Sequence, residues 1–256
     1  MFLAIGFVII FSRPVKAAAN GVILKANRTY AAYDVTGDGM KDKIRIRAAN
    51  QTDDEAYTSL TVSVNGKTAC RLKNTRFYNV IANIYTLKNG QPFLYLYAPA
   101  DNGDGPVCAL LKYTNGKFRK ALDFTEIMAG YGNHRIGEVT NLNGNKIVIT
   151  ESIVSYSLGI NAINFTYKYV NGKFVPTSRY GSYKEIYSTD GSSRYFTVNS
   201  DLPAYARPGA TAVNTTLKAG SLTKIIKCAL ISGKMYIQLE CDGEIYWIKA
   251  LENPPI

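Results

Sequence analysis

The sequence predicts an all-β protein that contains repeated four-stranded antiparallel units. The tripeptide Asn-Gly-Lys recurs at 65–67, 115–117 and 171–173, and alternating β-branched and aromatic residues flank each copy. Asn-Gly is the strongest short signal for a hairpin, because both residues of the tight turn must accept positive φ. No stretch shows sustained helical periodicity, and only residues 123–131 predict a short helical turn.

Each copy belongs to a longer pattern of strand, tight turn, strand, variable loop, strand, Asn-Gly turn and strand. The three units cover about 28–75, 78–125 and 130–180. Four antiparallel strands repeated every 50 to 56 residues are typical of propeller blades or a related repeated sheet. Three units are fewer than closed propellers usually have. An open propeller fragment, a small closed barrel and a stack of sheets are therefore all compatible with the pattern.

The N-terminus predicts a secretory signal peptide at 1–19. Residues 2–11 are uncharged and almost wholly apolar, and Ala17 and Ala19 match an A-x-A cleavage site. A membrane span needs about 20 apolar residues, so this run is too short to be one. No Lys or Arg precedes the run, which departs from the usual pattern, and a buried N-terminal strand is the alternative. We expect a secreted or cell-surface protein that begins at Asn20 and has no membrane span after cleavage.

Export permits disulfides, and the chain has four cysteines. Pairing within each part of the chain would join Cys228 to Cys241 and Cys70 to Cys108, and buried free thiols are the alternative. No CxxC motif occurs and the lone His134 is not close in sequence to any cysteine. Both facts argue against a zinc site.

An aspartate-rich loop, DVTGDGMKD at 34–42, lies in the first unit. Its oxygen donors fall at positions 1, 3, 5, 7 and 9 of a calcium-binding loop, in the order Asp34, Thr36, Asp38, the Met40 carbonyl and Asp42. Gly39 at position 6 permits the sharp turn. The pattern predicts one calcium ion as the cofactor, and the alternative is an acidic turn whose aspartates bond to backbone amides.

This loop resembles those of integrin-type (FG-GAP or VCBS-like) β-propeller blades of exported bacterial proteins. In that family such loops join the first two strands of a blade and can bind calcium. This sequence departs from the family pattern, because position 3 is Thr36, position 12 is Arg45, and the second and third units lack the carboxylates. The resemblance covers about 15 residues closely and the remainder of 28–180 only by its repeat.

The pattern changes at about residue 196, and the segment 196–256 resembles a bacterial SH3-like domain. The resemblance rests on AYARPG at 204–209, TLKAGSLTKII at 216–226 and GKMYIQLECDGEIYWIKA at 233–250. It implies a small barrel after a repeat domain at 20–195, and a shallow groove that binds peptidoglycan or another wall ligand. The residues expected at that groove are Tyr205, Arg207, Tyr236, Tyr246 and Trp247. For Trp247 a position in the barrel core is the alternative.

No catalytic motif is present, and the carboxylates Asp123, Glu126, Glu138 and Glu151 have no spacing that brings two of them together, so we interpret them as surface groups. The sequence therefore favours an exported, non-enzymatic binding protein of the bacterial cell envelope. An exported wall- or glycan-active enzyme with an SH3-like targeting domain is the alternative. The net charge is +11, and +9 once Arg13 and Lys16 are removed. Nucleic acid ranks last as a partner, because the basic residues are scattered along the sequence.

Overall fold

The structure, a computed structural model, describes residues 22–101, 105–127, 134–155, 159–187 and 194–250. It is all-β, as predicted, and its sheets are antiparallel. The short helix α1 (Phe124–Ile127) lies within the segment that predicted a helical turn. No sheet closes into a barrel within these ranges. The predicted signal peptide at 1–19 lies outside the described residues.

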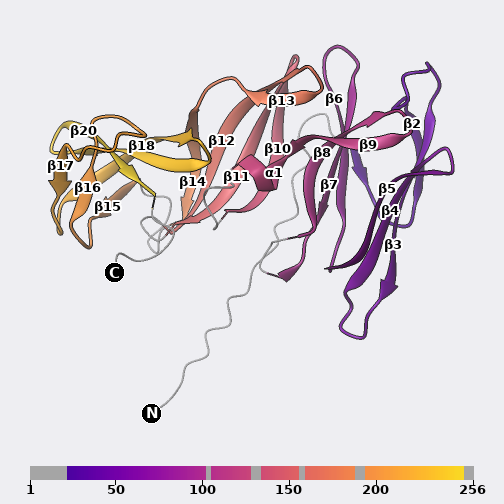
Figure 1. Cartoon of the computed structure of the whole chain (residues 1–256), viewed down its shortest axis with the longest axis horizontal. Helices are drawn as coiled ribbons and strands as arrows, with labels where there is room; N and C mark the ends of the chain where they lie inside the picture. Colours follow the sequence, from indigo (N-terminus) through magenta and orange to yellow (C-terminus); the bar gives the residue numbers. More distant parts are fainter. Residues whose placement is uncertain (1–21, 102–104, 128–133, 156–158, 188–193, 251–256) are drawn as a thin grey trace.

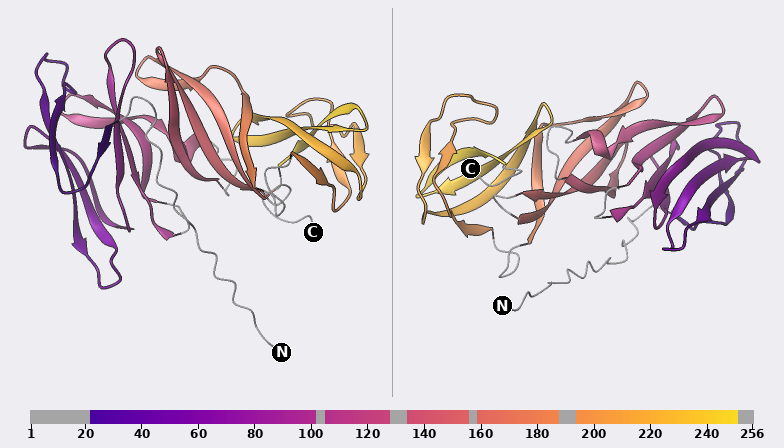
Figure 2. Two further views of the ribbon diagram at one scale, coloured as in Figure 1. Left: turned by 180° about the vertical axis from the view of Figure 1, so that it is seen from behind. Right: turned by 60° about the horizontal axis from the view of Figure 1, so that its bottom comes forward.

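Three sheets follow one another along the long axis of the molecule, and the C-terminal module at 196–250 occupies one end (Figure 1). The first sheet contains β2 (Thr29–Tyr33), β3 (Asp42–Gln51), β4 (Tyr57–Val64) and β5 (Lys67–Phe77) in this order. The second sheet contains β1 (Val22–Leu24), β6 (Ile81–Thr86), β7 (Pro92–Ala98), β8 (Val107–Thr114) and β9 (Lys117–Asp123). Figure 2 shows the same succession from behind.

The third sheet is the largest and continues into the C-terminal module. It begins with β10 (His134–Asn143), β11 (Lys146–Ser155), β12 (Gly159–Val170), β13 (Lys173–Pro176) and β14 (Tyr180–Tyr187). The module adds β15 (Tyr195–Thr197), β18 (Leu222–Ile231), β19 (Lys234–Cys241) and β20 (Glu244–Lys249). A separate hairpin contains β16 (Leu202–Ala204) and β17 (Thr215–Leu217).

The second sheet is buried on both faces, and its sequence shows why. Strand β7 reads PFLYLYA: Leu94 and Leu96 belong to a core shared with the first sheet, whereas Tyr95 and Tyr97 belong to a core shared with the third. Successive side chains of a strand point to opposite faces. A strand with apolar or aromatic residues at every position therefore fits between two other sheets.

The Asn-Gly turns adopt the predicted conformation. Asn65 and Gly66 have φ of 51° and 79°, and the pairs at 115–116 and 171–172 have similar values. The flanking residues pair across each two-residue turn, for example Val64 with Lys67. In an antiparallel sheet of four consecutive strands, both hairpin turns lie at the same end. The Asn-Gly turn of each unit therefore lies at the same end as the connection between its first two strands, which in the first unit is the aspartate-rich loop.

Strand β14 joins the third unit to the C-terminal module. On one side it pairs with β12, and on the other side Tyr180 and Gly181 pair with Ala229 and Cys228 of β18. One core runs through both parts, from Ile149 in β11 to Ile237 in β19. The predicted boundary near 195 thus falls within a continuous hydrogen-bonded sheet, so the two parts are mechanically connected.

We predict that Gly181→Ala destabilises the protein by about 1–3 kcal/mol, because a tightly packed site must distort to accept the added methyl group. A Cβ atom at residue 181 would lie 2.7 Å from Phe165 Cε1 and 2.9 Å from Ile163 Cγ2. The exposed neighbour Ser182→Ala is the matched control and should leave stability nearly unchanged. Thermal unfolding measures both, and equal melting temperatures for the two variants would contradict the junction described here.

Candidate functional sites

Strand register places three of the five predicted ligand-binding residues on the outer face of the C-terminal module. Residues directly opposite each other on antiparallel strands project to the same face, and the face alternates along a strand. Trp247 lies opposite Gln238, two residues from Tyr236 on the same strand. The backbones of Tyr205 and Trp247 exchange two hydrogen bonds, of 2.7 and 2.9 Å. The side chains of Tyr205, Tyr236 and Trp247 therefore share this face.

Tyr246, which the sequence also assigned to the groove, belongs to the opposite face. It pairs with Leu239 and packs against the hydrophobic core. Trp247 is only 4% exposed, so it forms the floor of the outer face rather than an open stacking platform. The sequence could not separate these two neighbours, because the register of β20 decides which of them turns outward.

Arg207 lies beside a residue that the sequence did not single out, Tyr180. A depression of about 330 Å³ is lined by Arg179, Tyr180, Arg207, Pro208, Gly209 and Ile231. We call it the Tyr180 depression. The Tyr180 ring lies 6.1 Å from the Trp247 ring, centroid to centroid. No sequence motif marks Tyr180, since β14 brings it to the module from outside the SH3-like segment.

Cations surround the Tyr180 ring. The Lys227 ammonium lies 4.7 Å from the ring centroid and the Arg179 guanidinium 5.4 Å from it, both within the range of cation–π attraction. None of the residues that line the depression is acidic. The site therefore combines an aromatic surface with positive charge, which suits a ligand with both an apolar ring face and an anionic group.

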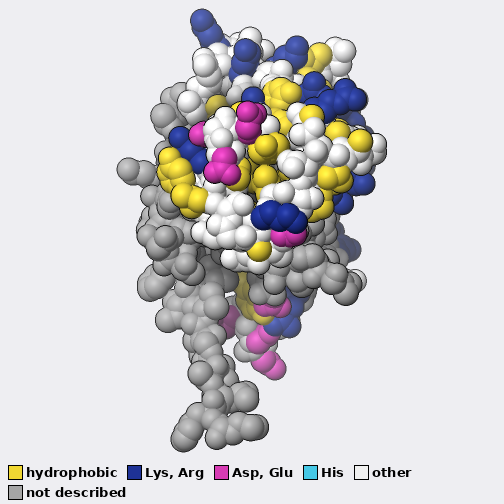
Figure 3. All heavy atoms as spheres, turned by 90° about the vertical axis from the view of Figure 1, so that its left-hand side faces the viewer, with side chains coloured by type: hydrophobic (Ala, Val, Ile, Leu, Met, Phe, Trp, Pro, Cys, Tyr) yellow, Lys and Arg dark blue, Asp and Glu magenta, His cyan; other side chains and the backbone are white. Residues whose placement is uncertain are grey.

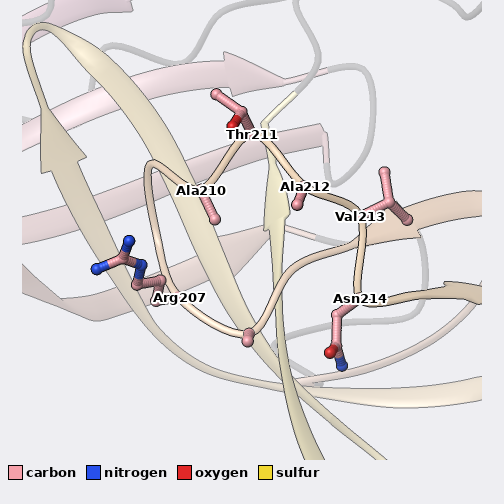
Figure 4. A pocket seen from close by; sticks show the side chains of 7 residues that line it. Arg207, Ala210, Thr211, Ala212, Val213 and Asn214 are labelled. Carbon is pink, nitrogen blue, oxygen red and sulfur yellow. The ribbon is translucent and has the colours of Figure 1, made fainter.

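A second hollow lies inside the 206–214 loop between β16 and β17, where Arg207 extends outward from the loop (Figure 4). The remaining side chains at this hollow are short or aliphatic except for Asn214. Arg207 thus borders both hollows. Figure 3 views the molecule from this end, where hydrophobic side chains form a band across the middle and Lys and Arg gather around its upper and right edges.

The predicted calcium loop has its carboxylates turned toward backbone amides. Asp34 accepts hydrogen bonds from the amides of Gly37 and Gly39, at 2.6 and 2.7 Å. Asp42 is 1% exposed and accepts from the amides of Val35 and Thr36, at 2.7 and 2.9 Å. These bonds lower the pKa of Asp34, against a raising contribution from desolvation.

The hydroxyl of Thr36 donates to both Asp34 and Asp42, at 3.2 and 3.3 Å. Asp38 accepts from the Met40 amide at 2.8 Å, and Met40 is 69% exposed. No group of three acidic, His or Cys side chains in the described ranges has metal-binding geometry. Calcium stays a prediction, and to bind, it has to displace donors that already occupy lone pairs of Asp34 and Asp42.

We predict that Asp42→Ala destabilises the protein by roughly 1–3 kcal/mol with or without calcium, because two loop amides lose their acceptor. Asp38→Asn should alter only a calcium-dependent part of the stability. Melting curves in millimolar calcium and in a chelator measure both effects. If the unmodified protein gives the same melting curve in calcium and in chelator, calcium does not bind and the loop is a structural turn.

A buried carboxyl group lies between the second and third sheets. Glu151 of β11 is 0% exposed, and neither carboxyl oxygen has a hydrogen-bond partner within the described part of the chain. Desolvation raises the pKa of Glu151 well above its usual range. The interpretation of Glu151 as a surface group is therefore wrong. Asp123 is also largely buried, at 8% exposed, and pairs with Lys120 and Thr125.

The polar groups near Glu151 bond to a backbone carbonyl instead. The hydroxyl of Tyr95 and the thiol of Cys108 donate to the Gly137 oxygen, at 2.7 and 3.3 Å. Burial raises the pKa of Cys108 to about 12. Residue 137 must be glycine here, because a Cβ atom would lie 1.9 Å from Phe124 Cδ1 and 2.3 Å from Glu151 Oε1.

We predict that Glu151→Gln makes the protein more stable at pH 8 and leaves it unchanged at pH 4. The unfolded carboxyl ionises near pH 4.5, whereas burial moves the ionisation of the folded one to higher pH, because it raises the pKa. The free energy of unfolding therefore decreases as pH rises above 4.5, by up to about 1.4 kcal/mol per pH unit, until the pKa of the folded carboxyl is reached. Because Gln is uncharged, the stability of the variant should not show this decrease with pH. Urea midpoints at pH 4, 6 and 8 measure it, and an unchanged slope in the variant would contradict the assignment.

All four cysteines are free thiols, so the predicted disulfides are wrong. Cys241 pairs with Thr223, five residues along β18 from Cys228, which corresponds to about 15 Å, whereas a disulfide needs Cα atoms within about 7 Å. Cys108 and Cys70 lie on opposite sides of the second sheet, because they pack in different cores.

Comparison with protein families, curated proteins and solved structures found no match for this chain. The SH3-like and blade-like resemblances therefore stay predictions from the sequence. No helix within the described ranges is long and apolar enough to cross a membrane.

Proposed function

We propose that this is an exported, non-enzymatic binding protein of the bacterial cell envelope, which engages a wall polymer or glycan through the Tyr180 depression. The observation that carries the proposal is the grouping of Tyr180, Trp247 and Arg207 with two further cations on one face of the module. Aromatic rings provide apolar contact area, and cations select the carboxylate or phosphate groups common in wall polymers.

The SH3-like resemblance and the chemistry of the depression both support this function. The resemblance implies wall ligands and export, and the blade-like units would serve as the body that carries the module. Tyr180 and Arg179 come from β14, so the site is complete only when the repeat region and the module are present together. Experiments therefore need the full chain rather than residues 196–256 alone.

We predict that the full chain sediments with purified Gram-positive cell walls even in about 0.5 M salt. Attraction between exposed charges is screened beyond roughly 8 Å in physiological salt and roughly 3 Å at 1 M ionic strength. Binding that persists in high salt therefore depends on direct contacts and not on long-range electrostatic attraction. Tyr180→Ala and Arg207→Gln should each lower this salt-resistant binding several-fold, because they remove the ring and one of the two arginines that line the depression.

Tyr195→Ala is the matched control. Tyr195 belongs to β15, which pairs with β18 of the module, and it is 53% exposed with the Lys224 ammonium 5.6 Å from its ring centroid. Its removal should leave sedimentation unchanged. Loss of all binding in high salt, or equal losses from Tyr180→Ala and Tyr195→Ala, would show that the depression does not hold the wall ligand.

A further inference from the structure

The outer face of the first sheet presents a second surface with its own chemistry, at the opposite end of the molecule from the module (Figure 1). Strand β3 reads DKIRIRAANQ with alternating burial, so Ile44 and Ile46 enter the core while Lys43, Arg45 and Arg47 are exposed. The pairing of β3 with β4 and of β4 with β5 then fixes which residues accompany these cations.

The register forms two rows of cations on either side of a row of hydroxyl groups. Arg47 lies opposite Thr61, which lies opposite Arg71. Two residues further along the strands in one direction, Ser59 lies opposite Lys73. Two residues in the other direction, Arg45 lies opposite Ser63. Strands lie about 4.8 Å apart, so the β3 and β5 backbones are roughly 10 Å apart across β4. Long cationic side chains on β3 and β5 thus flank the short Ser and Thr side chains of β4. We call this surface the cationic trough.

Within the described residues, the cations of the trough form no ion pairs. Strands β2 to β5 contain a single acidic residue, Asp42, which is buried and bonded to loop amides. In the part of the chain that the structure describes, one ion pair involves these strands, and it joins Arg76 at the end of β5 to Asp54 in the β3–β4 loop. The basic residues are scattered along the sequence, but the period of two within a strand and the register between strands bring these ones together on one face.

We propose that the cationic trough binds one extended strand of a phosphodiester polymer that lacks aromatic bases. Cations at every second residue of β3 are about 6.6 Å apart, which lets neighbouring side chains contact successive anionic groups of one chain. The Ser and Thr hydroxyls of β4 can donate to phosphate oxygens. The width between the two cationic rows suits a single polymer chain.

The outward-facing residues of the trough select against other polyanions. Single-stranded nucleic acids bind on surfaces that stack bases on aromatic rings, and the outward positions named above are Ser, Thr, Arg and Lys only. Tyr57, at the start of β4, stacks on Phe77 instead. Interfacial binding to membranes needs apolar side chains that insert below the headgroups, and the same positions supply none. This inference goes beyond the wall-binding role of the Tyr180 depression and concerns a separate surface.

The test uses the full chain and poly(glycerol phosphate) as the probe. The combined variant Arg45→Gln, Arg47→Gln and Arg71→Gln should weaken binding by on the order of tenfold or more at about 0.1 M salt, and should flatten the dependence of log affinity on log salt by about three. The matched control removes three exposed cations of the third sheet, with Lys146→Gln, Lys168→Gln and Lys173→Gln. It should change affinity by less than about twofold.

Thr61→Val, which replaces the central hydroxyl with a methyl group, should weaken binding several-fold while leaving the charge intact. Tyr180→Ala should leave binding of this probe unchanged, which separates the trough from the Tyr180 depression. Equal losses of affinity in the two triple variants would overturn the proposal, because the net charge of the protein alone would then explain binding. Equal or tighter binding to an oligodeoxynucleotide with the same number of phosphates, or to phosphatidylglycerol vesicles, would also overturn it.

Discussion

The second sheet is buried on both faces, and this burial holds the first and third sheets against it. Strand β7 places aliphatic residues in one core and aromatic residues in the other, so neither neighbouring sheet can separate without exposing a core. Burial of apolar surface contributes roughly 25 cal/mol per Å². The sheets are thereby held face to face, and only the outermost surfaces of the stack are left for binding.

That arrangement gives the two ends of the molecule different chemistry. At one end, the first sheet turns a polar face outward because its inner face is taken by the shared core. At the other end, β14 extends the third sheet into the module and places Tyr180 beside Trp247. Glu151 shows what the packed interior tolerates: a carboxyl without a partner, buried beside a glycine that has no room for a side chain.

Local sequence patterns predicted the local structure and left the long-range pairing open. Asn-Gly turns and alternating strands predicted the hairpins, because both signals reside in neighbouring residues. Nothing local distinguishes Trp247 from Tyr246, or reveals that Arg47 faces Arg71 across β4, since strand register decides both. The burial of Glu151 was missed for the same reason, because its surroundings come from β10 and β12 and from the second sheet.

Fluorescence of Trp247 can report whether a ligand occupies the Tyr180 depression, since its ring lies 6.1 Å from the Tyr180 ring and the chain has no other tryptophan. Soluble wall fragments titrated into the full chain in about 0.5 M salt should give a saturable change in emission. Arg207→Gln should shift that titration to higher concentration. Binding of the fragments by sedimentation or calorimetry without any change in Trp247 emission would contradict the account, because the ligand would then be held elsewhere.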